Sequence, residues 1–236
     1  MILAIDCGNS RIKWGASQDG RWIARGSAAY ADAQRLPLDW VALPAPRAVA
    51  IANVAGERAH SALAPYLERL PAAARWICAQ PRQCGVENGY REPATLGADR
   101  WAALIGARAL HRGASVVVMA GTATTVDRLD SDGRFRGGLI LPGAVLMKNA
   151  LASNTADLPL ASGRWSAAPE ATDDAIETGC LEAQAGAIER MHARIGGEAL
   201  CLLSGGAAAL IAPLLNIPVR LVDNLALEGL VRIASE

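Results

Sequence analysis

An internal repeat with a spacing of 113 residues constrains the fold of this chain more than any other feature. Each copy predicts a strand, a tight turn at a glycine, a second strand, a hairpin turn of sequence Asp-Gly and a third strand. The turn glycines are Gly8 and Gly121, and the hairpin turns begin at Asp19 and Asp132, so both pairs share one spacing. A single Asp-Gly hairpin is common, but two turns at one spacing predict two copies of one fold.

Strands alternate with helices after each repeated segment. In the first copy we expect strands over 48–54 and 75–79 and helices over 57–70 and 98–110. In the second copy we expect strands over 137–141, 199–203 and 219–222, helices over 144–152 and 175–194 and one ending at 214, and a loop over 153–171. This order predicts an α/β fold of two mixed sheets flanked by helices, with domains at residues 1–113 and 114–236 and a ligand cleft between them.

Charge and composition exclude several classes of protein. The 23 Lys and Arg residues balance the 23 Asp and Glu residues, which argues against a nucleic-acid or anionic-membrane partner. No apolar run approaches the roughly 20 residues needed to span a bilayer, and the first residues lack the basic segment of a signal peptide. The five cysteines include no Cys-x-x-Cys pair, so we expect reduced, buried thiols. We therefore expect a cytoplasmic protein with no nucleic-acid or membrane partner.

The first repeated turn has the residue types of an anion-binding loop. Gly8 permits close approach of a ligand to the backbone, and successive N–H groups of such a turn form an anion-binding concavity. Asp6 ends the preceding strand, where a carboxylate is suited to hold Mg²⁺ through water. For this segment alone, an ordinary hairpin with an Asx turn is the better interpretation. The second small-residue turn, over 121–125, makes a pair of nucleotide-phosphate loops the better interpretation.

A second group of candidate catalytic and binding residues lies at and before the start of the helix expected over 98–110. Asp99 lies in the first helical turn, where a carboxylate either stabilises the helix dipole or serves chemistry. Arg100 supplies donors suited to a carboxylate or phosphate, and the hydroxyl of Tyr90 lies nearby in the sequence. Together they suit an acidic substrate with a reactive hydroxyl. The turn over 204–206 admits a nucleotide or packs tightly, and the sequence does not decide between these.

These motifs, in this order along the whole chain, resemble those of the type III pantothenate kinases. The matching segments are Asp6–Lys13 (D-x-G-N-S-x-x-K), Gly89-Tyr90, Leu96–Arg100 (L-G-x-D-R), Gly121–Thr125 (G-T-A-x-T), Gly137–Gly143, Thr172–Gly179, Ser204–Gly206 and Leu225–Leu230. The resemblance implies two ribonuclease-H-like domains of the superfamily that contains acetate and sugar kinases, Hsp70 and actin. It also implies a homodimer that phosphorylates pantothenate to 4'-phosphopantothenate with ATP, the first step of coenzyme A synthesis.

The resemblance also implies roles for single residues. For binding ATP and its Mg²⁺ it implies Asp6, Cys7, Gly8, Asn9, Ser10, Arg11, Ile12, Lys13 and Thr122. For binding pantothenate it implies Tyr90, Gly97, Ala98, Asp99, Arg100 and Thr172, with Asp99 as the proton acceptor.

One position departs from the family pattern. Family members usually carry Asp two residues before the glycine of the Gly-Thr turn, where it holds a monovalent cation, and this chain has Met119. We therefore expect the K⁺ or NH₄⁺ site to be lost. Two other functions stay open at this stage: a non-catalytic accessory protein on the same fold, and a related kinase acting on a sugar or acetate.

Overall fold

The contacts of the chain divide it into two compact units, and the computed structural model describes all 236 residues. Unit 1 comprises Met1–Arg112, Gly133–Phe135 and Asn224–Glu236, and unit 2 comprises Gly113–Asp132 and Arg136–Asp223. The predicted domains of residues 1–113 and 114–236 differ from these units at Gly113, which belongs to unit 2, and at two further places. The C-terminal residues and the hairpin tip at Gly133–Phe135 pack in unit 1, because their apolar side chains are buried there.

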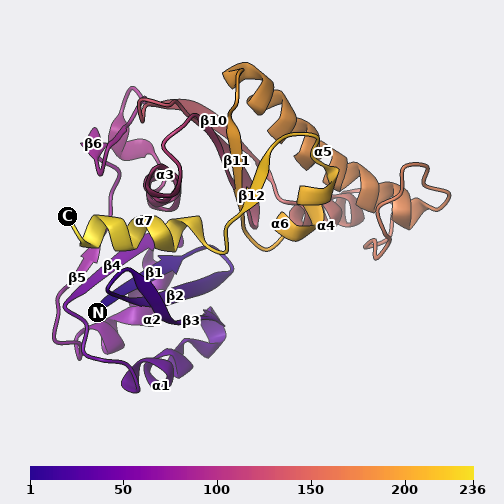
Figure 1. The fold of residues 1–236 in the computed structure, drawn as a ribbon. Helices are drawn as coiled ribbons and strands as arrows, with labels where there is room; N and C mark the ends of the chain where they lie inside the picture. Colours follow the sequence, from indigo (N-terminus) through magenta and orange to yellow (C-terminus); the bar gives the residue numbers. More distant parts are fainter. The chain divides into compact units, whose positions relative to one another are not determined.

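A five-stranded mixed sheet forms the centre of unit 1, in the order β3-β2-β1-β4-β5 (Figure 1). The central strand β1 pairs antiparallel with β2 and parallel with β4. The bounds are Ile2–Cys7 for β1, Arg11–Gln18 for β2, Arg21–Ala29 for β3, Ala48–Asn53 for β4 and Ala74–Trp76 for β5. Because successive side chains of a strand point to opposite faces, β1 contributes Leu3, Ile5 and Cys7 to one face and Asp6 to the other.

Helices cover both faces of this sheet. The 3-10 helix η1 (Tyr30–Arg35), α1 (Leu36–Val41) and α2 (Glu57–Leu67) pack on the face of Leu3 and Ile5. On the other face, α7 (Leu225–Ala234) lies between the sheet and α3 (Ala98–Leu110), as Figure 1 shows. A small hairpin of β6 (Arg82–Gln83) and β7 (Val86–Glu87) and the 3-10 helix η2 (Pro93–Thr95) precede α3.

Two glycines let α3 and α7 approach until their backbones touch. A Cβ on Gly229 would lie 1.7 Å from the carbonyl oxygen of Ala102, and a Cβ on Gly106 would lie 2.3 Å from that of Leu225. Asn224 caps the start of α7, where its Oδ1 accepts a hydrogen bond of 3.0 Å from the backbone N–H of Leu227. The close crossing fixes the N-termini of both helices in unit 1.

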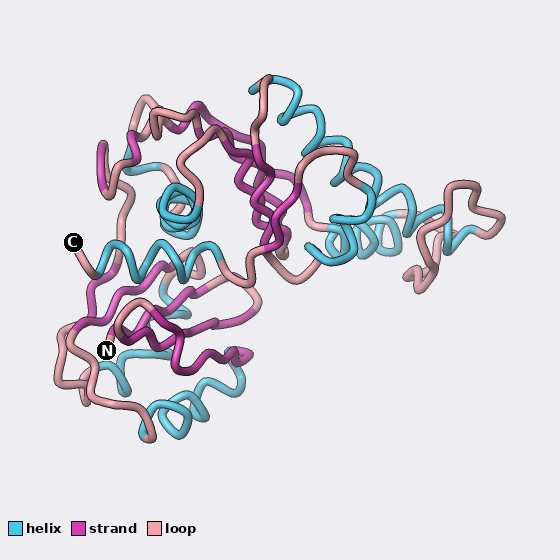
Figure 2. Tube along the Cα trace, in the orientation of Figure 1, coloured by secondary structure: helices cyan, strands magenta, loops and turns pink.

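The sheet of unit 2 repeats the architecture of the first, in the order β10-β9-β8-β11-β12 (Figure 2). Its central strand β8 pairs antiparallel with β9 and parallel with β11. The bounds are Ser115–Ala120 for β8, Ala123–Leu129 for β9, Phe135–Pro142 for β10, Leu200–Ser204 for β11 and Val219–Leu221 for β12. Equal strand order and direction in both sheets confirm the predicted α/β class with duplicated mixed sheets.

The helices of unit 2 pack over a core that includes Val116, Val118 and Leu203. Their bounds are Ala144–Asn154 for α4, Thr172–Ile195 for α5 and Ala208–Ile211 for α6, with the 3-10 helix η3 at Ala212–Leu214. In Figure 1 the long helix α5 extends beside α4 and α6, and residues 155–171 form the predicted loop.

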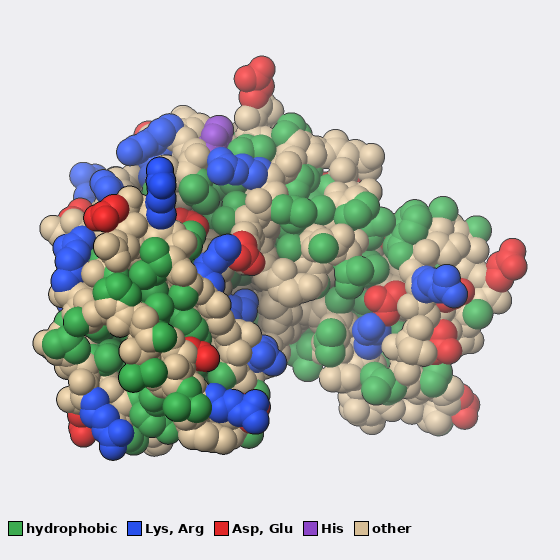
Figure 3. All heavy atoms as spheres, turned by 60° about the horizontal axis from the view of Figure 1, so that its bottom comes forward, with side chains coloured by type: hydrophobic (Ala, Val, Ile, Leu, Met, Phe, Trp, Pro, Cys, Tyr) green, Lys and Arg blue, Asp and Glu red, His purple; other side chains and the backbone are tan.

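Four segments were not expected from the sequence: the helical segment over 30–41, the hairpin of β6 and β7, the 3-10 helix η2, and α7. The first two are short and lack a sustained apolar period, whereas α7 is apolar on most of its surface. No helix of the structure combines the length and apolar character needed to cross a bilayer. On the face drawn in Figure 3, basic and acidic side chains lie among hydrophobic ones.

Candidate active site

The turn between β1 and β2 carries the first group of predicted site residues, Asp6 to Lys13. The backbone N–H of Gly8 donates to the carbonyl of Arg11 at 3.1 Å, and the N–H of Val54 donates to the carbonyl of Cys7 at 3.1 Å. These bonds hold the turn against the end of β4. Asp6 and Lys13 are directly opposite one another in the antiparallel register, so their side chains share one face of the sheet.

Asp6 is a buried carboxyl group among polar residues of four elements. Its side chain is 6% exposed. Burial is the largest effect and the charge of Asp99 is the next, and together they raise the pKa of Asp6 from 3.8 to about 6. The charge of Lys13 and a hydrogen bond with the side chain of Asn224 act in the opposite direction. Unit 1 therefore brings together the ends of β1 and β2 and the first residues of α3 and α7.

Asp99 lies in the first turn of α3, as predicted. Its Oδ1 accepts a hydrogen bond of 2.8 Å from the backbone N–H of Arg100. Burial raises the pKa of Asp99, while the backbone and guanidinium of Arg100 lower it. A Cβ on Gly97 would lie 2.7 Å from Asp99 Oδ1, so a side chain at that position would crowd the carboxylate. A carboxyl group whose pKa is raised in this way is a candidate for proton transfer in catalysis.

Arg100 lies beside a pair of neighbouring aromatic side chains, Tyr90 and Phe135. Its Nη1 donates to the hydroxyl of Tyr90 at 2.9 Å, and its Cζ lies 5.6 Å from the Tyr90 ring centroid and 5.8 Å from that of Phe135. The two ring centroids are 5.2 Å apart. Arg100 is only 5% exposed, so these contacts fix its guanidinium in the interior of unit 1. Tyr90 and Arg100 were predicted as a pair, whereas Phe135 was not.

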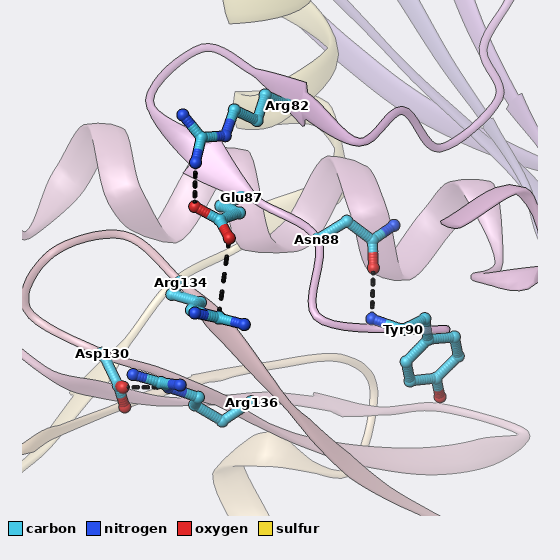
Figure 4. A network of polar contacts seen from close by, with 7 residues as sticks. All are labelled: Arg82, Glu87, Asn88, Tyr90, Asp130, Arg134 and Arg136. Atoms are coloured by element: carbon cyan, nitrogen blue, oxygen red, sulfur yellow. Dashed lines mark hydrogen bonds and ion pairs between the residues drawn. The ribbon is translucent and has the colours of Figure 1, made fainter. Parts of the chain in front are cut away.

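The loop that carries Tyr90 is fixed by its own polar contacts (Figure 4). The Oδ1 of the buried Asn88 accepts from the backbone N–H of Tyr90 at 3.1 Å, and its Nδ2 donates to the carbonyl of Pro93 at 3.1 Å. Beside it, Glu87 binds Arg82 at 2.6 Å and Arg134 at 3.6 Å.

Asn88 and Asn224 were not predicted as site residues from the sequence. The apolar run after Asn224 is the signal that predicts a capped helix start.

Thr122 and Thr172 belong to unit 2. Thr122 is exposed in the turn between β8 and β9, and its carbonyl accepts from the N–H of Gly143 at 2.9 Å. A Cβ on Gly143 would lie 2.1 Å from the carbonyl oxygen of Gly121, so this glycine permits the second small-residue turn to close. Thr172 begins α5 and lines a largely apolar cavity of about 770 Å³ between α4 and α5.

The turn over 204–206 has the geometry of tight packing. Gly205 has a φ of +108°, and a Cβ there would lie 2.4 Å from the carbonyl oxygen of Ala120. The hydroxyl of Ser204 donates to the carbonyl of Asp223 at 3.2 Å.

A separate ion pair lies in unit 2. It joins Asp130, directly after β9, to Arg136 of β10 (Figure 4).

All five cysteines are free thiols, as expected, but the expected burial holds only for Cys7, Cys180 and Cys201, since Cys78 is exposed and Cys84 is half-buried. Burial raises the pKa of Cys7 to about 12, so this residue of the first turn contributes backbone rather than a thiolate. No group of three or more His, Cys, Asp and Glu side chains is arranged to hold a metal ion. A single carboxylate such as Asp6 agrees with the few protein ligands that Mg²⁺ needs when a nucleotide shares it.

Comparison with known proteins gives one consistent result. The sequence model of the family described as type III pantothenate kinase matches residues 2–194. A type III pantothenate kinase of Aromatoleum aromaticum is 54% identical over 100% of this chain and 98% of its own length. One of Dechloromonas aromatica is 49% identical over 99% of both chains.

Solved structures that share the fold are more distant in sequence. One from Sinorhizobium meliloti, described as a 2-dehydro-3-deoxygalactonokinase, has a TM-score of 0.64 at 19% identity and covers 99% of this chain and 98% of its own. One from Campylobacter jejuni, described as a Baf family transcriptional activator, has a TM-score of 0.62 at 20% identity, covering 99% and 97%. These two show the fold alone, whereas the family match and the identities above show that this chain belongs to the type III pantothenate kinases.

Proposed function

We propose that this chain phosphorylates pantothenate to 4'-phosphopantothenate with ATP, the first step of coenzyme A biosynthesis. The observation that carries the proposal is the cluster in unit 1. Asp6 and Asp99 interact electrostatically, Lys13 stands opposite Asp6, and Arg100 is held by Tyr90 next to Asp99. The cluster combines an anion-binding turn, a carboxylate of raised pKa and a fixed guanidinium, which phosphoryl transfer to an acidic alcohol requires.

The first turn suits the nucleotide. ATP supplies the phosphoryl group, and Mg²⁺ neutralises charge on its phosphates. The ammonium of Lys13, the turn backbone over 7–12 and Thr122 of the second turn would bind phosphate oxygens. Asp6 would hold the Mg²⁺ through water. The buried position of Asp6 beside Lys13 supports this, because an ionised carboxylate there gains from a nearby cation.

The residues at the start of α3 suit pantothenate, which carries a carboxylate and a primary hydroxyl. The guanidinium of Arg100 would bind the carboxylate, and Tyr90 with Gly97, Ala98 and Thr172 would complete the pocket. Asp99 would accept the proton of the hydroxyl as the oxygen attacks. Phosphoryl transfer needs mainly positioning and charge neutralisation, so a base of modest strength suffices.

We also propose three further properties of the protein. They are a homodimer, a cytoplasmic location and Mg²⁺ as the metal. A requirement for K⁺ or NH₄⁺ is not expected, because Met119 stands where the family has Asp.

The test is an assay of purified protein with ATP, Mg²⁺ and pantothenate, in which 4'-phosphopantothenate is measured by mass spectrometry. We expect product from the wild type and about 10²–10⁴-fold less from Asp99→Asn. Acetate and a hexose, offered separately, should give no phosphorylated product. ATP turnover only with a sugar or acetate would contradict the substrate, and no turnover at all would favour an accessory protein.

A further inference from the structure

The hydroxyl of Tyr30 makes a hydrogen bond to the first repeated turn. Tyr30 begins η1, directly after β3, and its hydroxyl donates to the carbonyl of Gly8 at 2.9 Å. Its side chain is 8% exposed and packs in the same core cluster as Leu3, Ile5 and Cys7. Tyr30 therefore reaches the turn from the sheet face opposite to Asp6.

The orientation of one peptide plane follows from this bond. In a trans peptide the C=O of one residue and the N–H of the next lie in one plane and point in opposite directions, and this chain has no cis peptide. Fixing the Gly8 carbonyl toward Tyr30 therefore fixes the N–H of Asn9 away from Tyr30. An N–H group that is held in place before the ligand arrives binds a phosphate oxygen without a reorganisation cost.

Two features keep the Tyr30 hydroxyl protonated and its ring in place beside the Gly8 carbonyl. Burial is the main cause that raises the pKa of Tyr30 to about 12, so the hydroxyl retains its proton throughout the physiological range. The guanidinium carbon of Arg58, in the first turn of α2, lies 4.2 Å from the Tyr30 ring centroid. This stacking restrains the ring on its exposed side.

We propose that Tyr30 is a positioning residue for the nucleotide phosphates, acting through the peptide plane between Gly8 and Asn9, and that Arg58 holds the Tyr30 ring for this purpose. The inference rests on the proposed binding of ATP at this turn. It adds two residues, from β3–η1 and from α2, that the motif Asp6–Lys13 does not contain.

Tyr30→Phe is the decisive variant, because it keeps the buried ring and removes only the hydroxyl. Without this hydrogen bond the peptide plane between Gly8 and Asn9 is free to reorient, and we expect the KM for ATP to rise roughly two- to tenfold. The kcat and the KM for pantothenate should stay within about twofold of wild type. Tyr66→Phe is the matched control, since Tyr66 packs at the edge of the same core and should leave all constants unchanged.

A double-mutant cycle tests the contribution of Arg58. Arg58→Met keeps the aliphatic stem and should raise the KM for ATP in the wild-type background. It should have no further effect in the Tyr30→Phe background, because the hydroxyl through which Arg58 acts is then absent.

Calorimetric titration with ATP and Mg²⁺ separates this inference from the proposed function. If the wild type fails to phosphorylate pantothenate but binds ATP, the substrate assignment fails and the affinity of Tyr30→Phe still tests Tyr30. An unchanged Kd and KM for ATP in Tyr30→Phe would overturn the inference. A variant with a lower Tm and equal losses for both substrates would also overturn it, because Tyr30 would then be only a core residue.

Discussion

The carboxyl groups of Asp6 and Asp99 interact electrostatically in unit 1, one at the end of β1 and the other in the first turn of α3. The charge of Asp99 adds to the effect of burial and raises the pKa of Asp6 to about 6. An ionised Asp6 is therefore unfavourable for the fold, because its carboxylate is buried and lies near the charge of Asp99. If this turn binds a metal nucleotide as proposed, the metal cation would lower the cost of ionising Asp6.

The pH dependence of stability follows from the sign of this shift. Since the pKa of Asp6 is raised on folding, its contribution to stability is fully present below the ordinary value of 3.8 and is lost as pH rises through about 6. Asp6→Asn should therefore stabilise the metal-free protein by about 3 kcal/mol at most near pH 8, and by only about 1 kcal/mol near pH 4.5. Urea unfolding at both pH values measures the difference.

Asp157→Asn, in the exposed loop of unit 2, is the matched control and should change stability little at either pH. If Asp6→Asn increases the free energy of unfolding equally at both pH values, then folding does not raise the pKa of Asp6. The stabilised variant should nevertheless use Mg²⁺ and ATP poorly, which is the usual cost of a strained functional group.

Asp99→Asn should abolish most of the activity while leaving nucleotide binding intact. The amide keeps the size of the side chain and an oxygen that accepts from the Arg100 N–H, but it cannot accept the substrate proton. We expect kcat to fall about 10²–10⁴-fold with the Kd for ATP within threefold of wild type. Turnover above half of the wild-type value would mean that Asp99 only stabilises the start of α3.

Local sequence predicted the strands around both repeated turns, because hairpin chemistry and apolar alternation are short-range signals. It predicted α3 at Ala98–Leu110 with the bounds that the structure has. It did not predict that Asn224 reaches Asp6, or that Phe135 packs on Arg100. Both contacts join residues more than 30 positions apart, and they arise from the packing of α7 and of the hairpin tip in unit 1. The local hydrophobic periodicity of a sequence does not predict such long-range packing.

The crossing of α3 and α7 should tolerate no side chain at Gly229. A Cβ there would lie 1.7 Å from the carbonyl oxygen of Ala102, which is backbone and cannot move aside. Gly229→Ala should therefore destabilise the protein by several kcal/mol, although alanine is the better helix former. Gly186→Ala in α5 is the matched control, because nothing lies within 4 Å of that Cβ, and it should stabilise by about 0.5–1 kcal/mol. Thermal unfolding of both variants measures the contrast, and a Gly229→Ala protein as stable as wild type would contradict the crossing.

Met119 leads to a prediction about monovalent cations. It lies on β8 beside Thr125 of β9 and Ser204 of β11, and its carbonyl accepts from the N–H of Gly121 at 3.2 Å. A thioether is soft and uncharged, so it does not replace the carboxylate that holds a hard cation such as K⁺. We expect the initial rate in a buffer of organic cations to change less than about twofold when KCl is added at constant ionic strength. Met119→Asp restores the carboxylate of the family pattern and should gain a saturable KCl dependence. A steep rise from near-zero activity in the wild type would show instead that other oxygen ligands of unit 2 hold the cation without Asp at this position.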